Sequence, residues 1–86
     1  MSLLSENVIH GNHGKIFETN ATEHNDVLAI AEAISKLKGI KDVIVNESHF
    51  PKQLTVHTSS IVSVKAIEDV VIKKGFHAIP KSVFEL

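Results

Sequence analysis

The chain has 86 residues, 43% of them hydrophobic and 22% charged, and it contains no cysteine but six histidines. This length suffices for one small core, and the apolar fraction excludes a disordered tail. The formal net charge of −1 leaves no basic excess for nucleic acid or an anionic membrane. The lack of cysteine excludes disulfides, thiolate metal sites and thiol redox chemistry.

The chain has no segment that resembles a membrane span or a secretory signal. No apolar run approaches the roughly 20 residues of a transmembrane helix. The first six residues lack the basic stretch and the long apolar stretch of a signal peptide. We therefore expect a soluble, cytoplasmic protein.

The N-terminal part holds one clear strand signal. Residues 1–14 show no sustained hydrophobic period, and we interpret them as a tail or as a short extra strand at residues 7–10. Residues 15–19 are short and rich in β-favouring side chains, which predicts the first strand. Residues 20–25 are polar and predict a loop that leads into a helix.

The first helix is predicted by apolar residues that share one helical face: Val27, Ile30, Ala31, Ile34 and Leu37. We expect Asn25 or Asp26 to cap its start, and Gly39 to end it. A strand over residues 40–46, a turn over 47–52 and a half-buried strand over 54–57 follow.

The second helix is predicted by the stripe Val64, Ile67, Val70 and Val71. Ser63 is its expected cap, and Gly75 its expected end. Residues 76–79 begin a last strand, which we expect Pro80 to interrupt and to restrict to an edge of the sheet. The order βαββαβ predicts an α+β, ferredoxin-like sandwich, with two helices on one face of a four-stranded antiparallel sheet in a single domain over residues 15–86.

Several short segments carry a family resemblance over residues 15–79. They are residues 17–20 (Phe-Glu-Thr-Asn), 38–40 (Lys-Gly-Ile), 43–46 (Val-Ile-Val-Asn), 54–56 (Leu-Thr-Val) and 73–76 (Lys-Lys-Gly-Phe). In this order and spacing the chain resembles the heavy-metal-associated domain of copper chaperones, mercury-binding proteins and metal-pumping P-type ATPases. It looks most like the small stand-alone bacterial members.

The resemblance implies a metal loop that this chain has replaced. The family binds soft metals with a Met-x-Cys-x-x-Cys loop between the first strand and the first helix. Counting back from Gly39, Ala21 stands at the methionine, and Glu23 and Asp26 stand at the two cysteines. Carboxylates do not select Cu(I), because hard oxygen donors suit harder ions. Copper transfer by the family's thiolate chemistry is therefore not expected.

Other donors converge on the same end of the predicted fold. The first loop, the turn at residues 47–52 and the junction at Gly75 leave the sheet at one end, together with Glu23, His24, Asp26, His49 and His77. Histidine with carboxylate suits Zn(II) or Ni(II). Our metal hypothesis places Glu23, His24 and Asp26 around such an ion, with His77 as a more distant candidate.

A simpler interpretation competes with this hypothesis. Asp26 and Glu23 also suit the start of a helix, and histidines in polar turns are commonly solvated. The expected strand order puts the turn at residues 47–52 on an edge strand, away from the first loop. His10 and His13 are separated by two residues in the N-terminal segment, a pattern that more often binds adventitious metal. His57 should point outward from the sheet.

No catalytic constellation is present, since the chain has neither a cysteine nucleophile nor a recognisable serine or phosphate-binding motif. We expect no enzyme activity and no resident cofactor apart from the Zn(II) or Ni(II) alternative. The favoured hypothesis is a degenerate heavy-metal-associated domain that binds a transporter domain or another copy of itself through Lys73, Lys74 and Phe76. A small-molecule regulatory domain of the ACT type is a third hypothesis, but residues 20–25 lack the glycine of such ligand loops.

Overall fold

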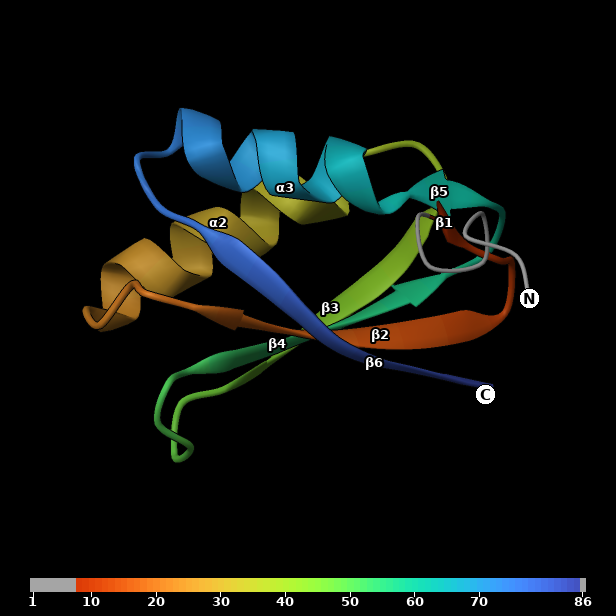
Figure 1. Cartoon of the computed structure of the whole chain (residues 1–86). Coiled ribbons are helices and arrows are strands. Elements are labelled where there is room, and N and C mark those ends of the chain that lie inside the picture. Colours follow the sequence, from red (N-terminus) through yellow and green to blue (C-terminus); the bar gives the residue numbers. More distant parts are fainter. Residues whose placement is uncertain (1–7, 86) are drawn as a thin grey trace.

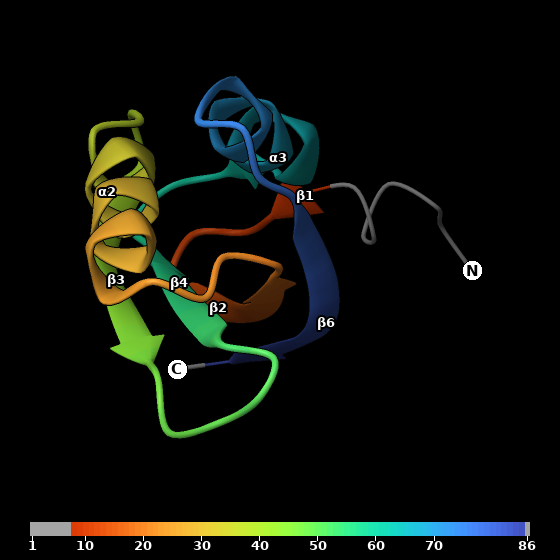
Figure 2. The same cartoon turned by 90° about the vertical axis from the view of Figure 1, so that its left-hand side faces the viewer.

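The computed structural model describes residues 8–85 and confirms the ferredoxin-like architecture. Its elements are β1 (Val8–Ile9), β2 (His13–Thr19), α2 (His24–Ser35), β3 (Ile40–Asn46), β4 (Gln53–Thr58), β5 (Val62–Ser63), α3 (Val64–Lys73) and β6 (Ala78–Glu85). The main sheet has the strand order β3-β4-β2-β6, and all of its pairings are antiparallel. Both helices lie on one face of this sheet (Figure 1), side by side when viewed along their axes (Figure 2).

The core lies between the helices and the sheet. Alternate residues of β2 and β4 point toward the helices, as the strand period requires. Strands β2 and β4 and helices α2 and α3 all contribute fully buried side chains: Phe17, Val27, Ile30, Ile34, Leu54, Val56, Ile67 and Val71. The apolar stripes predicted for the two helices are thus the surfaces that close the core.

The N-terminal segment contributes a short strand to the structure. Val8 pairs with Ser63 and Ile9 with Val62, so that β1 and β5 form a separate antiparallel pair. The Ile9 side chain is fully buried in the common core. The main sheet also begins earlier than expected, because β2 starts at His13. The division of the chain at residues 14 and 15 stays a prediction.

The helix starts were predicted with mixed success. Ser63 caps α3 as expected, and its side chain accepts a hydrogen bond from the Ala66 amide. The prediction that Asn25 or Asp26 caps α2 is wrong, since the cap is Glu23, whose side chain makes no capping hydrogen bond. The first helical bond runs from the Val27 amide to the Glu23 carbonyl. The helix therefore includes Asn25 and Asp26 in its first turn.

The last strand does not stop at Pro80. Strand β6 lies at the edge of the sheet as predicted, but it continues to Glu85. The register with β2 shifts between Ile16 and Phe17, and Phe17 is the partner of Pro80. Proline is tolerated at an edge or a bulge because its missing N–H need not interrupt a central ladder.

Candidate functional site

Three connections meet at one end of the sheet, which we call the loop end: residues 20–23, 47–52 and 74–77 (Figure 1). Hydrogen bonds join them. The Thr19 amide donates to the Lys52 carbonyl at 3.0 Å, and the His77 amide donates to Asn20 Oδ1 at 2.8 Å. The loop that the resemblance assigns to metal binding is therefore held between the other two connections.

The residues at the family's metal positions lie in different surroundings. Ala21 is buried, and its amide donates to Thr19 Oγ1 at 3.3 Å. Glu23 is exposed, and Asp26 lies half-buried in the first turn of α2, where a negative charge favours the helix dipole. Within residues 8–81, neither carboxylate has an ion-pair partner. Both acidic side chains are thus available to an external group.

His24 contacts the turn between β3 and β4. Its Nδ1 lies 2.5 Å from Glu47 Oε2, and Lys52 Nζ donates to the Glu47 carbonyl oxygen at 3.2 Å. The expectation that this turn lies away from the first loop is therefore wrong. The turn joins β3 to β4, and β4 is the direct neighbour of β2, so that the turn lies beside the end of β2. The sequence gives no sign that Glu47 contacts His24, because no local pattern links residues 23 positions apart.

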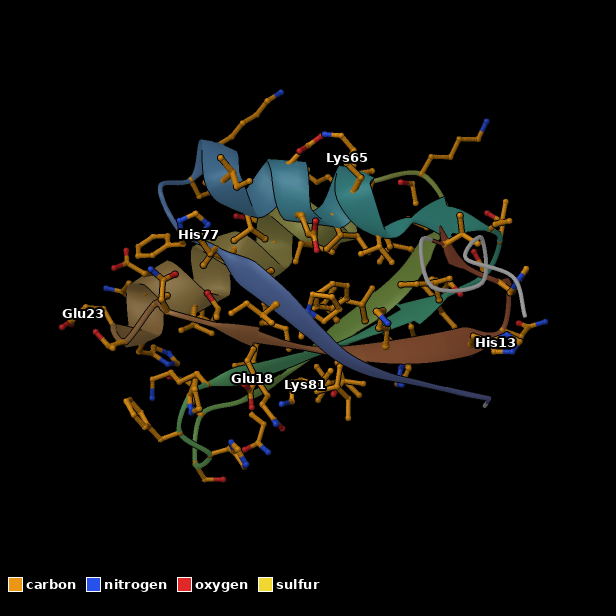
Figure 3. The ribbon with its side chains drawn as sticks, in the orientation of Figure 1. His13, Glu18, Glu23, Lys65, His77 and Lys81 are labelled. Carbon is orange, nitrogen blue, oxygen red and sulfur yellow. The ribbon has the colours of Figure 1, made fainter. Side chains whose placement is uncertain are left out.

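The predicted donors do not gather around one point. Figure 3 shows Glu23 and His77 at the same end of the molecule, and they lie on different connections. His49 Nδ1 interacts instead with the Pro51 carbonyl oxygen at 3.1 Å within its own turn. Among the described residues, no three histidine or carboxylate side chains are close enough to hold a metal ion together.

The basic residues at the end of α3 also belong to the loop end. Lys73 and Lys74 are exposed, and Phe76 is half-buried against the core. Neither lysine forms an ion pair with a described residue, so they do not neutralise Glu23 or Asp26. The loop end therefore presents separate acidic and basic groups to solvent.

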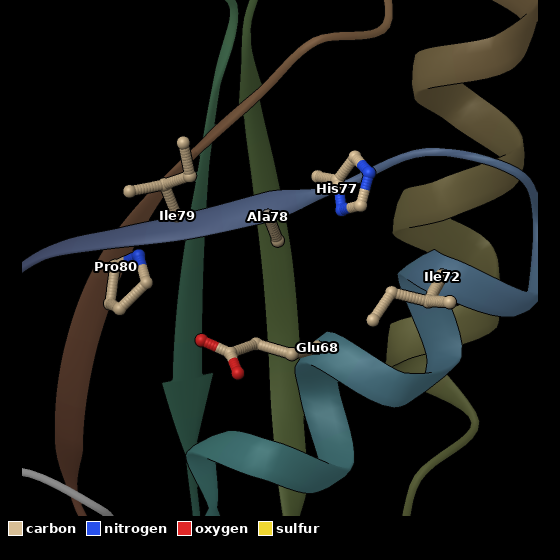
Figure 4. A pocket seen from close by; sticks show the side chains of 6 residues that line it. All are labelled: Glu68, Ile72, His77, Ala78, Ile79 and Pro80. Atoms are coloured by element: carbon tan, nitrogen blue, oxygen red, sulfur yellow. The ribbon is translucent and has the colours of Figure 1, made fainter.

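An open groove of about 580 Å³ lies beside the loop end, between α3 and the edge strand β6 (Figure 4). It is lined by Glu68, Ile72, His77, Ala78, Ile79 and Pro80. The Ile72 and Ile79 side chains are more than half exposed, and the Glu68 carboxylate points toward β6. No sequence pattern indicates this groove, because it forms where helix α3 and strand β6 meet. Within residues 8–85, no helix is long and apolar enough to span a bilayer.

Solved structures share this fold. The first domain of the human copper chaperone for SOD1, in its copper(I)-loaded form, matches with a TM-score of 0.68 and 20% identity, over 81% of this chain and 93% of that one. The apo HMA domain of a copper chaperone for superoxide dismutase matches with a TM-score of 0.66 and 20% identity, over 85% and 71% of the two chains. The fold is that of a heavy-metal-associated domain. The CsoZ metallochaperone has it too, with a TM-score of 0.61 and 21% identity over 77% of this chain and 94% of that one.

The heavy-metal-associated fold was predicted from the order and spacing of the short segments, and the solved structures confirm it. No protein-family model matches the chain, and no curated protein matches it. At about one-fifth identity the structural likeness concerns the fold. What this chain does with that fold depends on its own residues.

Proposed function

We propose that this chain is a non-catalytic binding module with the heavy-metal-associated fold, in which the thiolate Cu(I) site has been lost. The observation that carries the proposal is the composition of the loop between β2 and α2. Glu23 and Asp26 stand where the family resemblance expects two thiolates, and the whole chain has no cysteine. Oxygen donors select harder ions than Cu(I). We expect the module to act in the cytoplasm.

A Cu(I) competition experiment tests the loss of the thiolate site. Under reducing, anaerobic conditions, the wild-type chain should leave Cu(I) on a chromogenic chelator such as bathocuproine disulfonate. The double substitution Glu23→Cys with Asp26→Cys should withdraw Cu(I), because a helix N-terminus stabilises thiolates. Ala21 is retained because it is buried, and methionine there would disturb the core.

The matched control is Glu32→Cys with Ser35→Cys. These two residues have the same spacing and lie exposed on the same helix, away from the loop end. This control should compete less well for Cu(I) than the variant at the loop end. A wild-type chain that competes for Cu(I) would contradict the proposal. A folded loop-end variant no better than the control would mean that the loop is built differently from the family's.

The binding role is supported by the unneutralised charges at the loop end. Lys73 and Lys74 are exposed beside the half-buried Phe76, and we propose that they dock an acidic surface of a transporter domain or of a second copy. Sedimentation velocity over a range of concentrations measures self-association, and titration with the soluble domain of a metal transporter measures the other case.

A charge-reversal pair separates specific docking from general electrostatic attraction. The change Lys73→Glu with Lys74→Glu should weaken association at least tenfold. The control Lys36→Glu with Lys38→Glu makes the same charge change after the other helix, at the far end of the sheet, and should leave association nearly unchanged. A monomer at every concentration, with no affinity for the transporter domain, would contradict docking.

The second candidate function is binding of Zn(II) or Ni(II) by Glu23, His24 and Asp26. The contact between His24 Nδ1 and Glu47 favours it, because a carboxylate on one ring nitrogen orients the other nitrogen toward a metal. The side chains would have to converge for binding, since no three described donors lie together.

Calorimetry with Zn(II) and Ni(II) tests this second function. The titration uses the His10→Ala, His13→Ala variant, so that the histidines at the opposite end add no heat. Removal of residues 1–14 would be unsuitable, because it would delete the buried Ile9 and the start of β2. Micromolar binding that disappears with Glu23→Ala and Asp26→Ala would support the site. The absence of any binding heat would exclude it.

A further inference from the structure

The turn between β1 and β2 brings two imidazole rings together. His10 is exposed and His13 is half-buried, and their ring centroids lie 5.8 Å apart at an interplanar angle of 61°. Figure 3 shows His13 at the opposite end of the molecule from Glu23. The pair is therefore separate from the loop end.

The sheet fixes the backbone of this turn through Thr58, which is fully buried on β4. The Thr58 hydroxyl donates to the His10 carbonyl oxygen at 2.6 Å, and its oxygen accepts from the His13 amide at 3.4 Å. The Asn12 amide donates to the Thr58 carbonyl at 2.9 Å. Ile9, directly before the turn, is anchored in the core. The two histidines thus lie on a turn whose backbone is fixed by hydrogen bonds to the sheet.

A backbone contact also selects the tautomer of His13. Its Nδ1 lies 3.1 Å from the carbonyl oxygen of Gly11. Because a carbonyl oxygen can only accept, Nδ1 carries the proton and donates, which leaves the lone pair on Nε2. Metal-binding histidines typically have this arrangement, with one ring N–H on a backbone carbonyl and the other nitrogen on the metal.

The separation of the rings brings both within reach of one ion. A metal about 2.1 Å from each ligating nitrogen lies about 3.2 Å from each ring centroid. Two centroids 5.8 Å apart then subtend an angle of about 130° at the metal, which is wider than the roughly 90° between neighbouring ligands of tetragonal Cu(II), so that one ring must turn for both nitrogens to bind. The exposed His10 ring can turn to direct a nitrogen at that point, because its side chain is not packed in the core.

We propose that His10 and His13 form a bidentate site for a borderline divalent cation, in which water or an exogenous ligand fills the remaining positions. Imidazole nitrogens suit Cu(II), Ni(II) and Zn(II), and the general order of affinity puts Cu(II) first. Hard ions such as Mg(II) prefer oxygen donors and should not bind here. The site depends on neither the thiolate chemistry of the family nor the residues of the loop end.

The test is calorimetric titration of the full chain with Cu(II), Zn(II) and Mg(II). We expect tight binding of one Cu(II) per chain, weaker binding of Zn(II) and none of Mg(II). His10→Ala and His13→Ala should each weaken Cu(II) binding at least tenfold. The matched control, His49→Ala, removes an exposed histidine at the loop end and should change Cu(II) affinity less than twofold. Equal effects of all three substitutions, or Cu(II) affinity that is retained when both His10 and His13 are replaced, would overturn the proposal.

A second measurement locates the metal without relying on substitutions. In an amide correlation spectrum, Cu(II) at the proposed site should first broaden the signals of residues 9–14 and 57–59, while the loop end stays sharp. Broadening that begins at residues 20–26 and 47–52 would overturn the proposal and would favour the second candidate function. A Thr58→Val variant that folds should retain the histidines but bind Cu(II) several-fold more weakly, because its turn is no longer held.

Discussion

Gly39 and Gly75 have almost the same backbone conformation in different surroundings. Their φ angles are +94° and +91°, in the left-handed region where a side chain is strained. A Cβ on Gly39 would lie 2.6 Å from Ser60 Oγ and 2.8 Å from Val62 Cγ2, whereas a Cβ on Gly75 would meet nothing within 4 Å. Gly75→Ala should therefore lower the free energy of unfolding by about 1 kcal/mol, and Gly39→Ala by about 2–4 kcal/mol. Urea denaturation followed by circular dichroism measures both.

The difference between the two losses of unfolding free energy separates the cost of steric overlap at the added Cβ from the cost of the left-handed backbone conformation. Adding Ser60→Ala to Gly39→Ala should recover part of the loss, because it removes the nearest atom. Equal losses for Gly39→Ala and Gly75→Ala would mean that the close approach of residues 39 and 62 does not constrain the fold.

At the scale of the elements, the two helices differ in how they begin. Ser63 caps α3 with its side chain, whereas Glu23 caps α2 only through its backbone. Ser63→Ala should lower the free energy of unfolding by about 1 kcal/mol. Glu23→Ser should raise it by about 0.5–1 kcal/mol, because a serine hydroxyl can accept from an amide of the first turn. Thermal denaturation of both variants checks this, and a stabilising effect of Ser63→Ala would refute it.

The elements that could be predicted are those with a long enough hydrophobic period. The stripe containing Ile30 and Ile34 marked α2, and the alternation around Val56 marked β4. The short strands β1 and β5 have two residues each and therefore no period, although an extra strand at residues 7–10 was one of the alternatives. These two strands pair through Ile9 and Val62, and these residues are far apart in the sequence.

The candidate site was harder to predict than the fold. Counting along a family pattern predicted that Glu23 and Asp26 lie near the start of the first helix. In the structure both residues lie at the junction between β2 and α2. The contact of His24 with Glu47 depends on the strand order, which places the second turn beside the first loop. The Thr58 hydrogen bonds that hold the two N-terminal histidines likewise join distant segments, so that no local pattern could indicate them.

At the scale of the whole molecule, the candidate binding residues lie at the two ends of the sheet, and one continuous core connects these ends. Helices α2 and α3 run in opposite directions along this core, so that α2 begins where α3 ends (Figure 1). The loop end carries Glu23 and Asp26, and the far end carries the His10–His13 turn. Because the same core holds both ends in position, a loss of core stability should affect the structure of both.

Ile9 in the N-terminal strand should contribute as much to the stability of that core as Ile34 in helix α2. Ile9 is fully buried, as is Ile34 on α2, whereas Ile61 is 61% exposed. Ile9→Ala should therefore lower the free energy of unfolding by about 2–4 kcal/mol, close to the effect of Ile34→Ala. Ile61→Ala should cost less than about 0.5 kcal/mol. In a domain whose total stability is on the order of 5–10 kcal/mol, the first two losses are easily measured by urea denaturation. If Ile9→Ala behaved like Ile61→Ala, residues 8–9 would lie outside the cooperative core, and the His10–His13 turn would have lost one of its two anchors.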